Sequence, residues 1–133
     1  MMILQSICVN LAVIFYLTFS YMNFNLQISG FASDKGKAFI EILNAKGGVV
    51  SQEVITIINK KVSKEINVPT AGKYGIKVFH DENNNKKMDT NLVGFPLERW
   101  GTSNGVRPAF RAPKLDEILL EIKVNDIVKV AIR

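Results

Sequence analysis

The sequence has almost no cysteine and only one histidine, and these shortages exclude several kinds of chemical site. Its 133 residues contain one cysteine, Cys8, and one histidine, His80. Disulfide frameworks need paired cysteines, and cysteine-based zinc sites need several of them. Cys8 lies in an N-terminal segment that we expect to be removed. The folded part is therefore predicted to have no disulfide, no thiolate nucleophile and no cysteine-based zinc site.

Charge is also missing from the start of the chain, where the first charged side chain is Asp34. Residues 1–21 are mostly apolar, which is typical of an export signal helix or a membrane anchor. At about 20 residues, the segment is at the lower limit of what spans a bilayer. Thr18 and Ser20 are small enough for the minus-three and minus-one positions of a signal-peptidase site, so cleavage near Ser20 is predicted, with a retained anchor as the alternative. The protein is expected to be exported, and to be periplasmic, at the cell surface or secreted.

The remaining charges, a formal net of +5, form no dense basic stretch with interleaved aromatic residues. Nucleic-acid-binding surfaces usually show such clusters, so no nucleic-acid partner is expected. Hydrophobic residues make up 47% of the chain, a proportion typical of a folded globular protein. We therefore expect one domain, 23–133. The protein is expected to contact a membrane only if the N-terminal segment stays uncleaved, and then only through that segment.

Apolar residues after the first segment recur with a period of two. Phe24, Leu26 and Ile28 alternate with polar residues, which is the pattern of a half-buried strand. No segment after Met22 has a helical stripe, and turn residues separate the strands at regular intervals. About seven short strands predict an all-β fold, an antiparallel β-sandwich. The other predicted strands are 38–42, 50–58, 66–68, 74–78, 118–124 and 127–132.

A long irregular segment follows the strand that ends at Phe79, and its first part places oxygen-bearing side chains at alternate positions. In a calcium loop, positions 1, 3, 5 and 9 face the cation and position 7 offers its backbone carbonyl. Such hard oxygen ligands suit calcium better than zinc. The pattern therefore predicts a metal site for calcium, the one cofactor expected, with these ligands: Asp81, Asn83, Asn85, Lys87 and Asp89.

Two residues depart from the calcium pattern. Lys86 stands at position 6, where glycine makes the sharp turn, and Leu92 stands at position 12, where a bidentate glutamate belongs. The alternative is a structural turn in which asparagine side chains bond to the backbone. Both interpretations stay open at the level of sequence.

The same segment contains five candidate binding residues: His80, Glu98, Trp100, Ser103 and Asn104. Trp100 and Phe95 could stack on a sugar or another ring, or they could pin the segment to the sandwich. His80, Asp81 and Glu98 could serve a small hydrolase or a carbohydrate-active accessory module. However, neighbouring residues of a strand point to opposite faces, so a structural histidine is the favoured interpretation.

A longer pattern runs from Gly72 to Phe110. It reads G-x-Y-x-I-x-V-F-H-D, an Asn-rich turn, D-T-N, G-x-P-x-E, an aromatic-Gly-x-Ser-Asn segment and P-x-F. It resembles the signature of a family of secreted bacterial proteins, domain of unknown function 2141. The resemblance implies an export signal and a transthyretin-like or immunoglobulin-like β-sandwich, and it supplies no activity. Members of that family commonly have Asn-Gly where this chain has Asn85-Lys86, which weakens the calcium inference.

The leading hypothesis from the sequence is a non-enzymatic, exported binding or structural domain. Its recognition surface would be the loop from His80 to Asn104, and its partner a protein or a carbohydrate. The hydrolase or accessory module is the alternative. Convergence of the three polar side chains on an open cleft would favour that enzyme.

Overall fold

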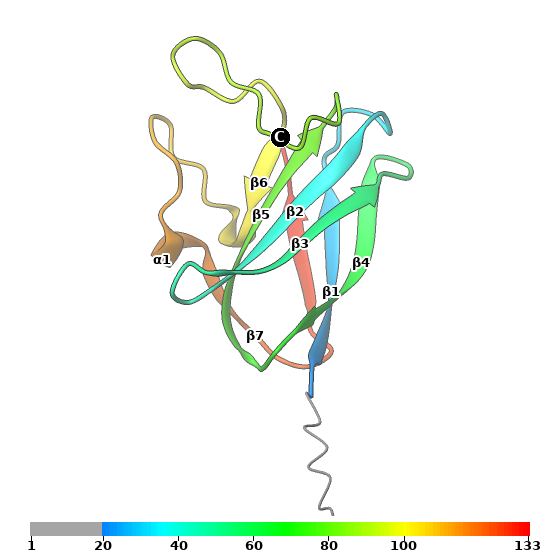
Figure 1. Cartoon of the computed structure of the whole chain (residues 1–133), viewed down its shortest axis with the longest axis vertical. Helices are drawn as coiled ribbons and strands as arrows, with labels where there is room; N and C mark the ends of the chain where they lie inside the picture. The colour runs from blue at the N-terminus through cyan, green and yellow to red at the C-terminus, as the bar shows by residue number, and fades with distance from the viewer. Residues whose placement is uncertain (1–19) are drawn as a thin grey trace, which may run out of the picture.

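The computed structural model describes residues 20–133, which form two β-sheets (Figure 1). The predicted signal or anchor, 1–21, lies outside the described residues except for its last two. Among residues 20–133, no helix is long and apolar enough to cross a membrane. The strands are β1 (Met22–Ser29), β2 (Lys37–Asn44), β3 (Val49–Thr56), β4 (Lys61–Val68), β5 (Gly72–Asp81), β6 (Trp100–Thr102), β7 (Leu119–Ile122) and β8 (Ile127–Ala131), with the short helices η1 (Ser103–Gly105) and α1 (Leu115–Ile118).

The predicted all-β sandwich is confirmed. One sheet has the strand order β4-β1-β8, and the other has the order β3-β2-β5-β6 with β7 also paired to β5. The structure has eight strands rather than about seven, because the segment predicted to be irregular contains β6. It is also not wholly antiparallel, since β1 and β8 pair in parallel. The chain changes sheets between β7 and β8, and this crossing allows β8 to run beside β1 in the same direction.

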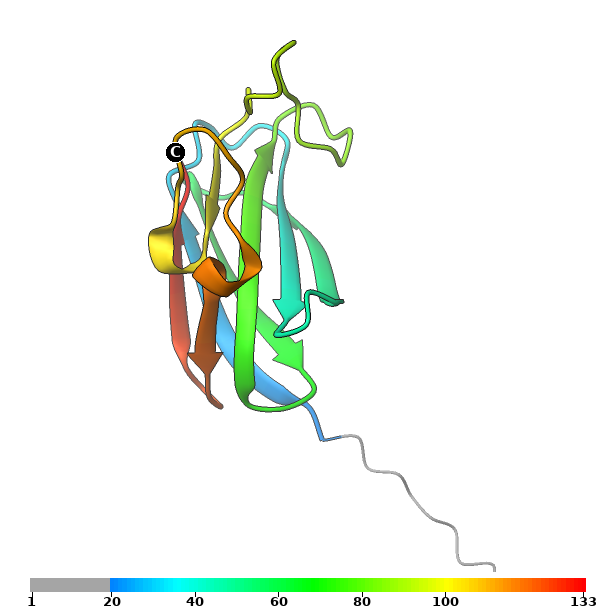
Figure 2. The ribbon, with the colours of Figure 1, turned by 90° about the vertical axis from the view of Figure 1, so that its left-hand side faces the viewer.

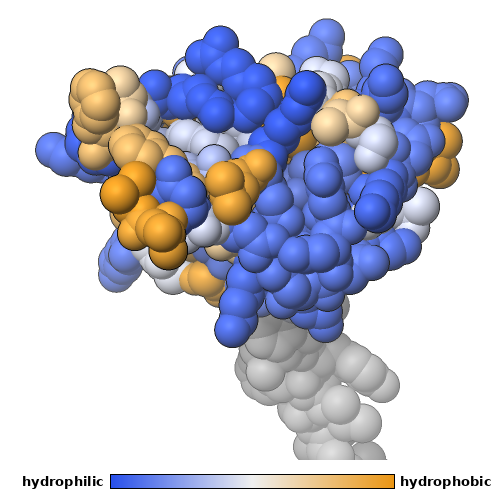
Figure 3. All heavy atoms as spheres, turned by 90° about the horizontal axis from the view of Figure 1, so that it is seen from above, coloured by the Kyte–Doolittle hydropathy of each residue, from blue (hydrophilic) through white to orange (hydrophobic). Residues whose placement is uncertain are grey.

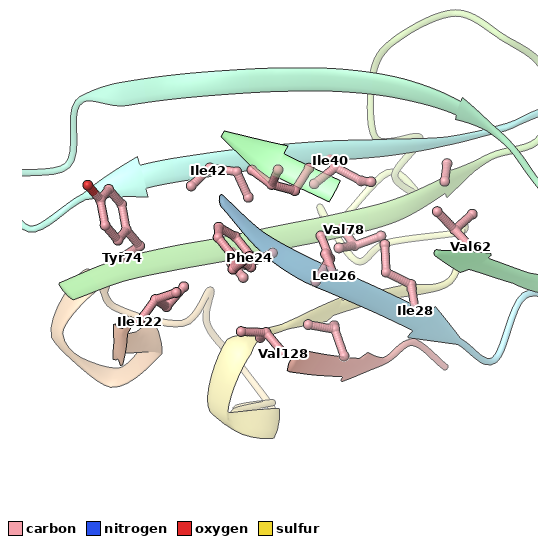
Figure 4. Packing of buried hydrophobic residues seen from close by; sticks show 14 of the residues in the cluster. Phe24, Leu26, Ile28, Ile40, Ile42, Val62, Tyr74, Val78, Ile122 and Val128 are labelled. Carbon is pink, nitrogen blue, oxygen red and sulfur yellow. The ribbon is translucent and has the colours of Figure 1, made fainter. Parts of the chain in front are cut away.

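The apolar faces of the two sheets meet in one core (Figure 4). Alternate residues of β1 point inward, and Phe24, Leu26 and Ile28 are at most 2% exposed. Ile40 and Ile76 face them from the second sheet and are fully buried. Burying an aliphatic or aromatic side chain of this size contributes about 1.5–3 kcal/mol, so the period-two pattern accounts for the stability of the sandwich.

One end of the sandwich carries the functional candidates. Strand β5 ends there at Asp81, and the turn between β1 and β2 packs against it. Gly36 in that turn has a φ of +72°, and a Cβ atom at this position would lie 2.2 Å from the backbone oxygen of Asp81. Only glycine fits so close an approach. The start of the long loop is thereby held against a rigid scaffold.

Candidate functional site

The first half of the long loop is a polar turn, 81–89, that bonds to itself. Asp81 is 1% exposed, and its carboxylate accepts hydrogen bonds from the backbone N–H groups of Asn85 at 3.2 Å and Lys86 at 2.8 Å. The side-chain oxygen of Asn83 accepts from the same Asn85 N–H at 3.3 Å. Short amide and carboxylate side chains favour such turns because they reach backbone groups a few residues ahead.

The end of the polar turn, Asp89, faces the two asparagines. Nδ2 of Asn83 donates to one carboxylate oxygen of Asp89 at 2.6 Å, and Nδ2 of Asn85 donates to the other at 2.7 Å. The side-chain oxygen of Asn85 accepts from the Lys87 N–H at 2.9 Å. The structure thus brings the predicted ligand residues into one turn. In this arrangement, however, amide N–H groups rather than a cation lie against the Asp89 carboxylate.

The two departures from the calcium pattern have different structural outcomes. Lys86 has a φ of 61°, the left-handed conformation that glycine adopts easily, so the sharp turn forms without glycine. Leu92 is fully exposed and belongs to a different part of the loop. It therefore supplies nothing in place of the missing glutamate.

Glu98 brings a further carboxylate to the polar turn. Residues 90–97, which we call the apolar hairpin, fold back on themselves: the Leu97 N–H donates to the Asp89 carbonyl at 2.8 Å, and Thr90 and Pro96 form a β-bridge. The chain returns at Glu98 beside the polar turn, and Oε2 of Glu98 accepts from the Asp89 N–H at 3.2 Å. Spacing from Asp81 cannot reveal this residue, because the hairpin loops out the residues between.

The Glu98 carboxyl is buried and incompletely bonded. It is 9% exposed, and its Oε1 atom has no hydrogen-bond partner. Burial raises the pKa of Glu98 above its ordinary value, and repulsion by the Asp89 and Asp81 carboxylates raises it further, against the lowering effect of the backbone N–H groups of Asp89 and Glu82. A neighbouring positive charge would remove both the desolvation cost and the repulsion.

Acidic side chains alone do not form a metal site here. Among residues 20–133, no three His, Cys, Asp or Glu side chains are placed so that they could hold a metal ion by themselves. A cation beside Asp89 and Glu98 would also need amide and backbone carbonyl oxygens. This mixture of oxygen ligands is typical of calcium rather than of zinc or another transition metal.

His80 is enclosed rather than exposed. Its side chain is fully buried, with Nε2 2.6 Å from the Lys35 carbonyl oxygen and the ring edge-on to Phe31 at 5.3 Å. Its Nδ1 atom is 3.6 Å from a carboxylate oxygen of Glu82, beyond hydrogen-bond length. Asp81 is bonded to the polar turn instead. His80, Asp81 and Glu98 therefore do not converge on an open cleft.

Ser103 and Asn104 hold the chain after β6 in place. Ser103 is 1% exposed; its hydroxyl accepts from the Ile76 N–H at 2.9 Å and donates to the carbonyl of Ile118. Nδ2 of Asn104 donates to the carbonyls of Glu117 and Leu119. These bonds tie β5, η1 and α1 together. The structure thus places both residues in a junction away from the polar turn.

Trp100 lies on the outer face of the larger sheet, opposite Phe79 in the pairing of β5 and β6. The Arg107 guanidinium lies 4.4 Å from the centre of the Trp100 ring, and Phe39 and Phe79 stack on each other at 4.9 Å. The three rings line a groove of about 730 Å³ together with Phe95 and Pro108. Phe95 is 46% exposed, and the stacking platform of Trp100 and Phe95 considered from the sequence stays a prediction.

The comparisons with known proteins agree with the pattern between Gly72 and Phe110. No curated protein and no solved structure matches the chain. One family profile, described as an uncharacterized protein conserved in bacteria, matches residues 26–129. The match covers nearly the whole sandwich, including the polar turn and Glu98. The chain therefore belongs to the family of domain of unknown function 2141.

Proposed function

We propose that the protein is a non-enzymatic, exported binding domain whose polar turn takes up a calcium ion. The observation that carries the proposal is Glu98, a buried carboxylate with an unpartnered oxygen at a turn that already contains Asp81 and Asp89. Buried carboxylates are normally neutralised or fully hydrogen-bonded. A divalent cation at this position would compensate all three acidic groups.

The chain offers several oxygen ligands for that ion. Asp89 and Glu98 supply carboxylate oxygens, and Asn83 and Asn85 supply amide oxygens when their amide groups turn. Turning them breaks their present bonds to Asp89 and to the backbone. Calcium must therefore replace existing hydrogen bonds. We expect a dissociation constant of about 0.1–1 mM, the range of extracellular calcium modules.

Two further observations support the other parts of the proposal. The charge-free apolar segment 1–21 directly precedes β1, which is the arrangement expected of an exported domain. The buried ring of His80 and the self-bonded carboxylate of Asp81 face different partners, so neither is placed to act on a common substrate. Both observations favour a binding domain over a hydrolase.

Calcium titration by calorimetry, with thermal unfolding in parallel, tests the proposal. We expect binding heat and a raised unfolding temperature at millimolar calcium, and a much smaller response to magnesium, which prefers a stricter octahedral shell. The Asp89→Ala and Glu98→Gln variants should lose most of the response. Glu82→Gln is the matched control, because Glu82 is an exposed carboxylate of the same loop outside the ligand set. The absence of heat and of a thermal shift at 5-fold the expected dissociation constant, about 5 mM, would overturn the proposal.

A further inference from the structure

Two loops at the same end of the sandwich expose large apolar side chains. In the apolar hairpin, Leu92 is fully exposed, Val93 is 75% exposed and Leu97 is 68% exposed. In the loop that follows η1, Phe110 is 90% exposed. We call these four residues the tip surface. Exposed apolar side chains that gather in one region usually mark an interaction site.

The two loops approach each other across the outer face of the larger sheet. Residues of both, including Val93, Phe95, Pro108 and Phe110, line the same groove above Phe79. Figure 2 shows the hairpin projecting beyond the ends of the strands, and the loop after η1 running toward the same end. Seen from above in Figure 3, hydrophobic residues gather on one side of this end, next to hydrophilic ones. The tip surface thus projects from this end of the domain at the rim of the groove.

The exposed charges beside the tip surface are mainly positive. Lys86 and Lys87 are exposed and form no ion pair among residues 20–133. Three of the four acidic groups of the same loop point the other way, since Asp81 and Glu98 are buried and the Asp89 carboxylate is bonded to asparagine amides. Arg99 adds a further exposed cation, whose guanidinium reaches the Gly30 carbonyl. Glu82 is the fourth acidic group and is exposed, so the outward-facing charges of the loop are three cations against one carboxylate.

We propose that this end of the domain docks on a lipid bilayer with anionic headgroups. Projecting apolar side chains fit the boundary between headgroups and acyl chains, and flanking lysines gain about 1 kcal/mol each near an anionic surface. A protein partner would instead be expected to insert anchors into a pocket of this domain, and at the floor of the groove Phe39 is already stacked on Phe79 and Trp100 is covered by Arg107. The proposal does not depend on calcium binding.

A fluorescent probe at the tip tests the proposal in the full chain. An environment-sensitive label is attached through Leu92→Cys on a Cys8→Ser background, and the control label through Ser63→Cys, an exposed position on β4. Vesicles of phosphatidylglycerol and of phosphatidylcholine are compared in the presence of a chelator, so that any effect of calcium is excluded. The label senses the environment of residue 92 itself, even if the apolar segment 1–21 also binds to the vesicles.

We expect the label at position 92 to shift to the blue on phosphatidylglycerol vesicles, at least three times more than on phosphatidylcholine, and the label at 63 to stay unchanged. Replacing Lys86 and Lys87 by glutamine, or adding salt to about 1 M, should abolish most of the shift. A label at 92 that stays in water on both vesicles would overturn the proposal and point to a protein partner. Equal shifts on the two lipids would overturn it as well, since the charged residues would then have no role.

Discussion

The two halves of the long loop use their side chains in opposite ways. In the polar turn, 81–89, carboxylates and amides bond to the backbone and to each other. In the apolar hairpin, 90–97, backbone hydrogen bonds and the Asn91 side chain close the turn, while leucine and valine side chains lie in water. Hydrogen bonds within the first half therefore stabilise its conformation. The second half instead exposes apolar side chains whose burial does not contribute to the stability of the domain. The difference separates residues that stabilise the domain from residues available to a partner.

Replacing Asp81 by alanine should break the polar turn and have the largest effect. The backbone N–H groups of Asn85 and Lys86 would lose their acceptor at a buried position. We expect a loss of about 3 kcal/mol in the free energy of unfolding, measured by urea denaturation in a chelator. Asp81→Asn, which keeps one oxygen acceptor, should lose clearly less. Equal losses in the two variants would show that charge, not hydrogen bonding, maintains the turn.

Replacing Lys86 by glycine should sharpen the comparison by stabilising the polar turn. The φ of 61° at Lys86 strains a residue with a Cβ atom but not glycine. After allowance for the greater freedom of glycine in the unfolded chain, the gain should be about 0.5–1 kcal/mol in the same denaturation experiment. Lys87→Gly is the matched control, because Lys87 is not among the positive-φ residues. It should destabilise the protein instead.

Glu98, at the junction between the two halves, should make the stability of the protein depend on pH. Because its pKa is raised in the folded protein, chiefly by burial, its contribution to stability is fully present below the ordinary value of 4.5 and is lost as the pH rises through the raised pKa. The Glu98→Gln variant should lack this loss, while Glu82→Gln should keep it. Unfolding curves recorded between pH 4 and 8 give the comparison. If the free energy of unfolding varies with pH in the same way in the wild-type protein and in Glu98→Gln, the loss of stability does not come from Glu98.

Replacing Leu92 by serine should have the smallest effect on stability. Its side chain is fully exposed, so the free energy of unfolding should change by no more than about 0.5 kcal/mol. Leu26→Ser is the contrasting substitution, since Leu26 is fully buried in the core and its replacement should cost several times more. A large loss in Leu92→Ser, measured by thermal unfolding, would mean that the hairpin supports the fold.

The contact between Glu98 and the polar turn shows what local spacing could not predict, although Glu98 was among the candidate binding residues. The ligand types Asp81, Asn83, Asn85 and Asp89 follow from local spacing, because neighbours in a turn are placed by the backbone itself. Glu98 reaches the turn only because the chain between Asp89 and Leu97 closes into a hairpin. The left-handed conformation of Lys86 was also not expected from its residue type; the Lys86 N–H is bonded to the Asp81 carboxylate within the same turn.

The sequence by itself determined the sandwich, because the period-two alternation of apolar residues decides which face of each strand is buried. It also determined the family, the polar character of the turn at 81–89 and the burial of alternate apolar residues in β1. Only the tertiary structure decided that β1 and β8 pair in parallel, that His80 is enclosed against Lys35, and that Leu92 and Phe110 project beside one groove. Those outcomes depend on contacts between residues far apart in the chain, and local pattern does not encode such contacts.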